Sequence, residues 1–325
     1  MLTGCCLLIA TGGTIASRIN PTTGLAEPVC GAEDLLASLP LGARVCDIEL
    51  QTLTTVPSPH MGPSEWIALH KAVHAGLERS DIAAVLISHG TATLEETAWF
   101  LDLTLATDKP VVVFGAQRNA SEFDTDGPRN LASAMRIGIT PAARSHGVLV
   151  AMNQHINAAR EATKTHSFDV ETFQSGEWGY LGNVAPEKVI FHRTPVRRLH
   201  VPLISSILPR VDIVPMYAGA DGALVSAAAA AGAKGIVVQA VGAGHVNPAM
   251  YDAVRSAIAA GVSVVVATRI PNGGTRPCYG FTGSAQQLQD AGAILGGDLS
   301  AWKARILLML ALQKGGAGIA ELFQA

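Results

Sequence analysis

The sequence predicts an α/β protein made of two doubly wound α/β domains, the N-terminal one larger, joined by a linker. Short continuous apolar runs alternate with segments whose apolar residues recur at helical spacing, which is typical of buried parallel strands joined by helices. The chain has 325 residues, of which 49% are hydrophobic and 15% are charged. This length fits about two domains, each with a large apolar core.

Four runs are expected as strands of the N-terminal sheet, because they are apolar without alternation and so suit a sheet covered on both faces. They are residues 5–10, 83–87, 110–114 and 147–152. Three segments between them are expected as helices: 63–79, 94–105 and 131–139. The first of these has Pro63 near its start, and Trp66, Leu69 and Val73 follow at helical spacing.

The alternation of strands and helices breaks around residues 183–210, a stretch rich in proline and arginine. Such composition is typical of a linker. We therefore expect an N-terminal domain over 1–190, a linker over 191–212 and a C-terminal domain over 213–325. In the C-terminal domain, strands are expected at 212–216, 235–240 and 262–267, and helices at 220–231, 248–260 and 301–313.

Charge and cysteine content exclude several classes of partner. The net charge is −3 and there is no basic block, which argues against nucleic acid and against an anionic membrane. The five cysteines are irregularly spaced, so they form neither a disulfide framework nor a zinc pattern. The N-terminal apolar run is too short for the core of a signal peptide, and a cytoplasmic protein is expected.

Two strand ends carry unusual loops, and ligands of open α/β sheets bind beyond such ends. The first loop is TGGTIA at 11–16, where paired glycines allow close backbone approach and Thr14 presents a hydroxyl. The second, HGTATLEET at 89–97, places Thr91 at a helix start. Each could be only a turn, with Thr93 as a helix cap. Neither matches a phosphate-binding glycine pattern.

Taken together, the motifs are far more specific. They are TGGTIA at 11–16, HGTATLEETAWFLDL at 89–103, GAQR at 115–118, DGPRNL at 126–131, ATKTHSFDVETF at 162–173 and KARILLMLAL at 303–312. In this order and spacing the chain resembles the bacterial-type L-asparaginase family, from about residue 4 to its end. The resemblance implies hydrolysis of the side-chain amide of asparagine through a threonine acyl-enzyme. It also implies a homo-oligomer, a dimer or a tetramer of close dimers, in which a neighbouring subunit completes each active site.

The resemblance assigns roles to individual residues. Thr14 matches the family's nucleophile, Thr91 its second threonine and Lys164 its lysine. The implied substrate-binding residues are Gly13, Ser58, Pro59, Gly90, Ala116 and His245. These residue types suit the chemistry, because a neutral hydroxyl needs a nearby base and a buried lysine with a lowered pKa can serve. Backbone N–H groups of the glycine loops could stabilise the oxyanion, and the chemistry that the resemblance implies requires no metal and no organic cofactor.

Three departures from the family put part of this assignment in doubt. Ala92 stands where the family has the aspartate that pairs with the lysine and holds the substrate's α-ammonium group. Pro59 follows Ser58, the residue that matches a serine binding the substrate carboxylate, and stands where relatives often have Gln or Glu. Around Leu25 no tyrosine is present, although relatives often place one in this lid.

Two explanations of Ala92 remain open. It could be a deliberate replacement of the aspartate that traps substrate in an inactive enzyme, since the surrounding motif is intact. Alternatively, it could be natural, in a hydrolase for an amide that lacks the usual α-amino group or in an amino-acid-binding protein without turnover. Pro59 favours the second explanation, because two contacts to the α-amino group would then be missing together.

Other patterns are given structural interpretations. GAGH at 242–245 lacks the third glycine of a dinucleotide fingerprint, which argues against a dehydrogenase. His70 and His74 are four residues apart, but Lys71 replaces the glutamate of a zinc protease motif, so we expect them on a solvated face.

Acidic residues are also expected to have structural roles. Asp126 and Arg129 are expected to order a loop. Glu95 and Glu96 fall in the first turn of a helix, where their charge would complement the helix dipole.

Overall fold

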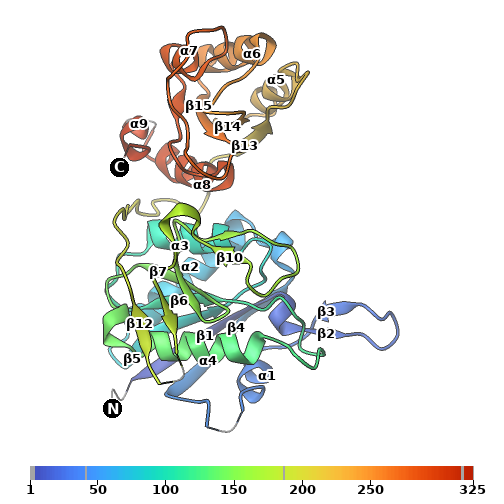
Figure 1. Cartoon of the computed structure of the whole chain (residues 1–325), viewed down its shortest axis with the longest axis vertical. Coiled ribbons are helices and arrows are strands. Elements are labelled where there is room, and N and C mark those ends of the chain that lie inside the picture. The colour runs from blue at the N-terminus through green and yellow to red at the C-terminus, as the bar shows by residue number, and fades with distance from the viewer. Residues whose placement is uncertain (1–3, 41, 186, 316–317, 325) are drawn as a thin grey trace. The chain divides into compact units, whose positions relative to one another are not determined.

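The computed structural model describes residues 4–40, 42–185, 187–315 and 318–324. The chain divides into two compact units, one ending at His200 and the other beginning at Val201. Each unit is built around its own β-sheet with helices packed against it (Figure 1). The predicted α/β class, with a larger N-terminal and a smaller C-terminal unit, is confirmed.

The first unit contains a sheet in the order β12-β11-β8-β7-β6-β5-β1-β4. The four predicted strands form its parallel centre: β1 (Cys5–Gly12), β5 (Ile82–Ser88), β6 (Val111–Phe114) and β7 (Val148–Met152). Three short strands extend one side in antiparallel fashion: β8 (His155–Ala158), β11 (Gly182–Val184) and β12 (Val189–Phe191). The sheet is therefore parallel where the unusual loops begin.

The opposite edge of this sheet is β4 (Asp47–Val56), a strand that was not predicted from the sequence. It pairs in parallel with β1. Its residues are half-buried or exposed along the whole length, because it is an edge strand with only one neighbour. A sequence of alternating polar and apolar residues with three threonines therefore lacks the continuous apolar run that identified the central strands.

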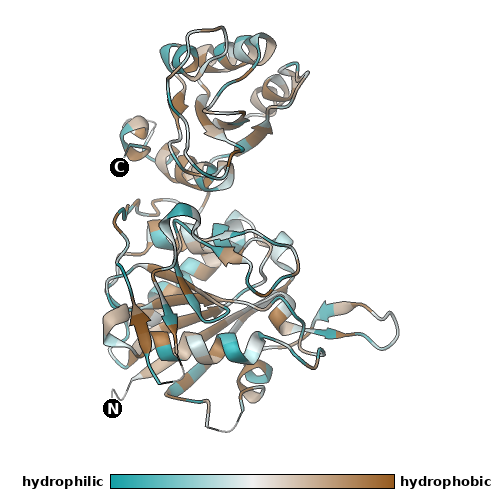
Figure 2. Cartoon of the chain, in the orientation of Figure 1, coloured by the Kyte–Doolittle hydropathy of each residue, from teal (hydrophilic) through white to brown (hydrophobic). Residues whose placement is uncertain are grey.

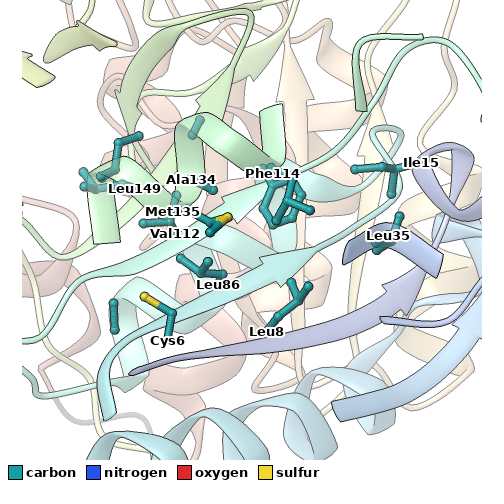
Figure 3. Close-up of a cluster of buried hydrophobic side chains, with 14 of the residues drawn as sticks. Cys6, Leu8, Ile15, Leu35, Leu86, Val112, Phe114, Ala134, Met135 and Leu149 are labelled. Atoms are coloured by element: carbon teal, nitrogen blue, oxygen red, sulfur yellow. The ribbon is translucent and has the colours of Figure 1, made fainter. Parts of the chain in front are cut away.

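Helices cover both faces of the first sheet. α1 (Ala32–Ala37) and α4 (Gly127–Gly138) share one face with the apolar cluster shown in Figure 3, which includes Leu35, Met135 and Phe114. α2 (Pro63–Glu78) and α3 (Leu94–Thr104) cover the other face, where the rings of Trp66 and Phe100 stack with centroids 5.5 Å apart.

The strand order places a switch point at β1. Its neighbours β4 and β5 lie on opposite sides of it. After β1 the chain forms β4 on one side, and it then crosses back to form β5 on the other side. Open sheets bind ligands at such points, beyond the carboxyl ends of the strands. The connections β5–α3–β6 and β6–α4–β7 move in the same direction while α3 and α4 cover opposite faces. These two crossovers therefore have opposite hands. Crossovers between parallel strands are almost always right-handed, so one of the two is unusual for this fold class.

The described part of the second unit has four parallel strands in sequence order: β13 (Val211–Pro215), β14 (Gly235–Ala240), β15 (Ser263–Thr268) and β16 (Ile294–Leu295). Its helices are α5 (Ala223–Ala230), α6 (Pro248–Ala259), α7 (Ala285–Asp290), α8 (Ala301–Leu312) and α9 (Ile319–Leu322). Figure 2 shows largely hydrophobic strands in both units. Among the described residues, no helix is both long and apolar enough to cross a bilayer.

Candidate active site

Three loops meet at the carboxyl ends of β1, β4 and β5. A Cβ added to Gly13 would lie 2.1 Å from the Cα of Gly90, and one added to Gly90 would lie 2.8 Å from the Cβ of Ser58. Gly13 also has φ +83°, a conformation that other residues rarely adopt. Glycine is thus required here because the backbones touch. This contact brings the loop of Thr14 against the loop of Thr91 and against Ser58.

The backbone N–H group of Gly13 already has a hydrogen-bond partner. Its N–H group donates a hydrogen bond to the carbonyl of Val56 at 3.1 Å. This donor joins the ends of β1 and β4, so in this conformation it does not point at a bound group, and substrate binding by Gly13 stays a prediction. The two glycines of the first motif permit close packing of the loops.

Lys164 and Thr91 form the polar centre of the site. Lys164 lies in the short strand β9 (Thr163–Lys164), which pairs with β10 (Phe173–Gln174). Its Nζ donates to the Thr91 Oγ1 at 2.8 Å. Burial lowers the pKa of the Lys164 ammonium, because the charged form loses solvation. A lysine that loses its proton more easily is a better candidate for a general base beside a hydroxyl.

Gln117 completes this centre, and it was not predicted from the sequence. Its Oε1 accepts hydrogen bonds from Lys164 Nζ at 3.0 Å and from Thr91 Oγ1 at 2.8 Å. The neighbouring Ala116 was expected to contact substrate, but its side chain is fully buried in the hydrophobic core. The motif GAQR was correctly singled out at the end of a strand. The side chain that faces Lys164 is one residue further along.

Glu95 corrects another expectation. Its carboxylate is buried and turned inwards, where it accepts hydrogen bonds from Thr163 Oγ1 at 2.9 Å and from the backbone N–H of Lys164 at 3.1 Å. The interpretation that Glu95 merely complements a helix dipole is therefore incomplete. This carboxylate fixes β9 to the start of α3, so that Lys164 and Thr91 are held on connected elements.

The residues around Ala92 also differ from expectation. Ala92 is exposed, whereas Thr91 is only 5% exposed. Thr93 occupies the cap position of α3, but its hydroxyl does not cap the helix and instead donates to the carbonyl of Ser58 at 2.8 Å. Ser58 is buried, whereas Pro59 is exposed. The Thr93 hydroxyl thus ties the second loop to the turn that carries Ser58.

Behind the second loop lies a hydrogen-bonded chain of buried groups. His89 is fully buried; its Nδ1 lies 2.8 Å from the Gly90 carbonyl and its Nε2 lies 2.9 Å from Thr97 Oγ1. Trp66 Nε1 donates to the same Thr97 hydroxyl at 3.0 Å. Because a carbonyl only accepts, Nδ1 carries the proton, and Nε2 accepts from Thr97. A neutral His89 therefore satisfies every group in this chain.

Burial lowers the pKa of His89 to about 4, and this predicts acid-sensitive stability. Between an ordinary pKa of 6.5 and a folded-state pKa of about 4, the unfolded chain binds a proton that the folded chain does not. Stability contributed by neutral His89 is therefore present above pH 6.5 and is lost as the pH falls towards 4, by up to about 3 kcal/mol.

The measurement is the free energy of unfolding in urea at pH 7 and at pH 4.5. We expect His89→Asn to be less stable at pH 7 and to show a smaller loss on acidification. The matched control is His74→Asn, because His74 is exposed on α2, and it should keep the full pH dependence. An unchanged pH dependence in His89→Asn would show that His89 is not the responsible group.

The other predicted residues lie as follows. His245 belongs to the second unit, where its Nδ1 accepts from the N–H of Ala285 at 3.1 Å and its ring lies 5.2 Å from those of Tyr279 and Phe281. The segment around Leu25 is part of an exposed hairpin, β2 (Ser17–Ile19) and β3 (Ala26–Pro28).

Two histidines were expected on a solvated face, and this is correct only for His74. His70 is half-buried, with its Nε2 3.4 Å from the carbonyl of Thr104. Within the part of the chain that the structure describes, no group of three or more His, Cys, Asp or Glu residues could hold a metal ion.

Comparisons with known proteins agree with this architecture. Residues 6–197 match the family model "Asparaginase, N-terminal", and residues 210–323 match "Glutaminase/Asparaginase C-terminal domain". The chain is 36% identical over 318 residues to L-asparaginase 2 of Escherichia coli, covering 94% of this chain and 88% of that protein. It is 35% identical over 316 residues to L-asparaginase 2 of Bacillus subtilis, covering 94% and 82%.

A solved structure is similar as well. The crystal structure of a probable cytoplasmic L-asparaginase from Campylobacter jejuni superposes with a TM-score of 0.90 at 33% sequence identity. The match covers 99% of each chain. Both units therefore have counterparts in proteins named L-asparaginase.

Proposed function

The chain belongs to the asparaginase family and is an asparaginase-like amidohydrolase, and on this premise we propose that it converts L-asparagine, or a close analogue, to the acid and ammonia through an acyl-enzyme on Thr14. The observation that carries the proposal is the contact of Lys164 Nζ with Thr91 Oγ1 at 2.8 Å. It places a lysine with a lowered pKa against the second threonine, on a loop that touches the loop of Thr14.

The proposed reaction has two steps. The Thr14 hydroxyl oxygen attacks the carbon of the side-chain amide and its proton passes to the Thr91 hydroxyl. The proton of Thr91, which is donated to Gln117 Oε1 at rest, turns to the deprotonated Lys164 amine for this transfer. The amide nitrogen takes up a proton and leaves as ammonia, which breaks the C–N bond and leaves an ester on Thr14. A water molecule then attacks the ester, releases the acid and returns the proton to Thr14. Each step needs a base near the hydroxyl, and Lys164 supplies it.

We further propose that Ala92 slows this reaction. An aspartate at this position would offer Lys164 a carboxylate and would give the α-ammonium group of asparagine a counter-charge. Alanine offers neither. Removal of an orienting carboxylate lowers turnover about 10⁴-fold in serine hydrolases, and we expect a loss in the same direction here.

Two alternatives predict different substrates. A hydrolase for amides without an α-amino group would not need the missing charge, and the pair Ala92 and Pro59 favours it. A non-catalytic binding protein would release no ammonia from either kind of amide.

The test is ammonia release from L-asparagine and from succinamate, its analogue without the α-amino group. Release is measured for the unsubstituted protein and for Ala92→Asp. Faster release from asparagine by Ala92→Asp supports the leading proposal. Fast release of ammonia from succinamate by the unsubstituted protein supports the first alternative. If no amide is hydrolysed by either protein, the enzyme proposal is wrong.

Assembly and location are also proposals. We propose a homo-oligomer, dimer or tetramer, of cytoplasmic location, and the Campylobacter jejuni protein is itself named cytoplasmic. Light scattering at micromolar concentration is expected to give at least twice the mass of the 33.7 kDa chain. A monomer under these conditions would contradict the assembly.

A further inference from the structure

We propose that Gln117 is a positioning residue that substitutes for the absent carboxylate, because its amide oxygen holds Lys164 and Thr91 in place while position 92 carries alanine. The inference rests on the proposed function, since Lys164 and Thr91 matter only if they move protons. Three groups meet within hydrogen-bond distance: Lys164 Nζ to Thr91 Oγ1 at 2.8 Å, Lys164 Nζ to Gln117 Oε1 at 3.0 Å, and Thr91 Oγ1 to Gln117 Oε1 at 2.8 Å.

The orientation of the Gln117 amide is fixed from its other end. Its Nε2 donates to the carbonyl of Asp169 at 3.0 Å and lies 3.4 Å from the carbonyl of Ser167. Backbone carbonyls accept and cannot donate, so the amide nitrogen must face them and the oxygen must face Lys164. A flipped amide would place its NH₂ group against the lysine amine. The chain therefore presents an acceptor to Lys164 in a single orientation.

The backbone of Gln117 is fixed as well. Its N–H lies 3.0 Å from the carboxylate of Asp126, which also accepts from the N–H of Arg118 at 2.9 Å and from Asn130 Nδ2 at 3.0 Å. Asp126 lies at the start of α4, so the end of β6 is tied to the next helix. The predicted loop-ordering role of Asp126 is thus correct, and it has a consequence for the site: it fixes the residue that holds Lys164.

An amide and a carboxylate differ in one respect that an experiment can measure. Both accept a hydrogen bond, but only the carboxylate stabilises the ammonium form of lysine by full charge and raises its pKa. Gln117 therefore orients Lys164 and leaves its proton easy to lose. It cannot provide the counter-charge for an α-ammonium group. The orientation of Lys164 is therefore retained in this chain, whereas the negative charge of the carboxylate is missing.

The first experiment is a double-mutant cycle. The kcat for L-asparagine is measured for the unsubstituted protein, for Gln117→Met, for Ala92→Asp and for the double variant. Methionine has a similar length, and its thioether sulfur is only a weak acceptor for the Lys164 amine. If Gln117 substitutes for the carboxylate, Gln117→Met lowers kcat by about tenfold in the presence of Ala92 and by much less in the Ala92→Asp background. Equal losses in both backgrounds would overturn the proposal.

A second readout does not depend on activity. The titration of Lys164 is followed by NMR of ¹³C-labelled lysine, with Lys164→Met to assign the signal. We expect the pKa of Lys164 to rise in Gln117→Glu and to fall in Gln117→Met, relative to the unsubstituted protein. Gln289→Met, at an exposed glutamine of α7, is the control and should leave the titration unchanged. Melting temperatures identify any variant that fails to fold.

The two readouts separate the possible failures. If no variant releases ammonia but the Lys164 titration shifts as expected, the proposed function is wrong and the contact is real. If activity appears in Ala92→Asp but Lys164 titrates identically in all three Gln117 proteins, Gln117 is only a packing residue and the inference is wrong.

Discussion

Replacement of Ala92 by aspartate is expected to raise turnover of L-asparagine by at least about a hundredfold, which corresponds to about 2.7 kcal/mol of transition-state stabilisation. The new carboxylate would follow Thr91 directly in the chain, and Thr91 already accepts a hydrogen bond from Lys164. It would orient the lysine by charge and would pair with the α-ammonium group of the substrate. The KM for asparagine should therefore fall while kcat rises.

The matched control for this experiment is Ala92→Asn, which has the same shape without the charge. We expect it to gain little, because neither the lysine nor the α-ammonium group finds a counter-charge. If Ala92→Asn equals Ala92→Asp, shape rather than charge is what the site lacks. If the unsubstituted protein already hydrolyses asparagine rapidly, the proposal that Ala92 slows the reaction is wrong.

Removal of the Thr14 hydroxyl is expected to abolish acylation. The experiment belongs in the Ala92→Asp background, where turnover is measurable, and Thr14→Ala should lower kcat by about 10⁴-fold or more, as loss of the nucleophile does in a serine hydrolase. Thr14 is only partly buried, so the loss of its hydroxyl should change stability little.

Two further variants make the result specific. Thr14→Ser retains a hydroxyl and should retain measurable turnover, whereas Thr14→Val retains the shape and should be as inactive as Thr14→Ala. All three should melt close to the parent temperature. Substantial turnover in Thr14→Ala, with unchanged melting, would remove Thr14 from the mechanism and would require another nucleophile.

The fold was largely predictable, because its central strands are buried on both faces and therefore appear as continuous apolar runs. β4 was not predictable by this criterion, since an edge strand is only half-buried and its sequence carries threonines and charges. The meeting of the two motif loops followed from the rule that ligands bind at the carboxyl ends of strands. The role of the glycines as points of backbone contact depends on long-range packing of the loops and could not be predicted from local sequence.

Within the site, the residues missed are those whose role depends on long-range contacts. Glu95 is positioned like a residue that complements a helix dipole, and only the fold brings β9, sixty-eight residues later at Thr163, against its carboxylate. Gln117 lies in a motif that the sequence singled out, but its acceptor role needs both Lys164 and the 167–169 backbone. Local sequence contains neither contact, so no spacing rule could have assigned these two side chains.

The central claim, that Thr14 attacks the side-chain amide of asparagine, is tested most directly by a crystal structure of the protein soaked with L-asparagine. Slow turnover in the presence of Ala92 should allow the substrate or its acyl form to accumulate. We predict electron density that places the side-chain amide carbon within about 3.5 Å of Thr14 Oγ1, or bonded to it. Asparagine bound with its side-chain amide turned away from Thr14 would contradict the account.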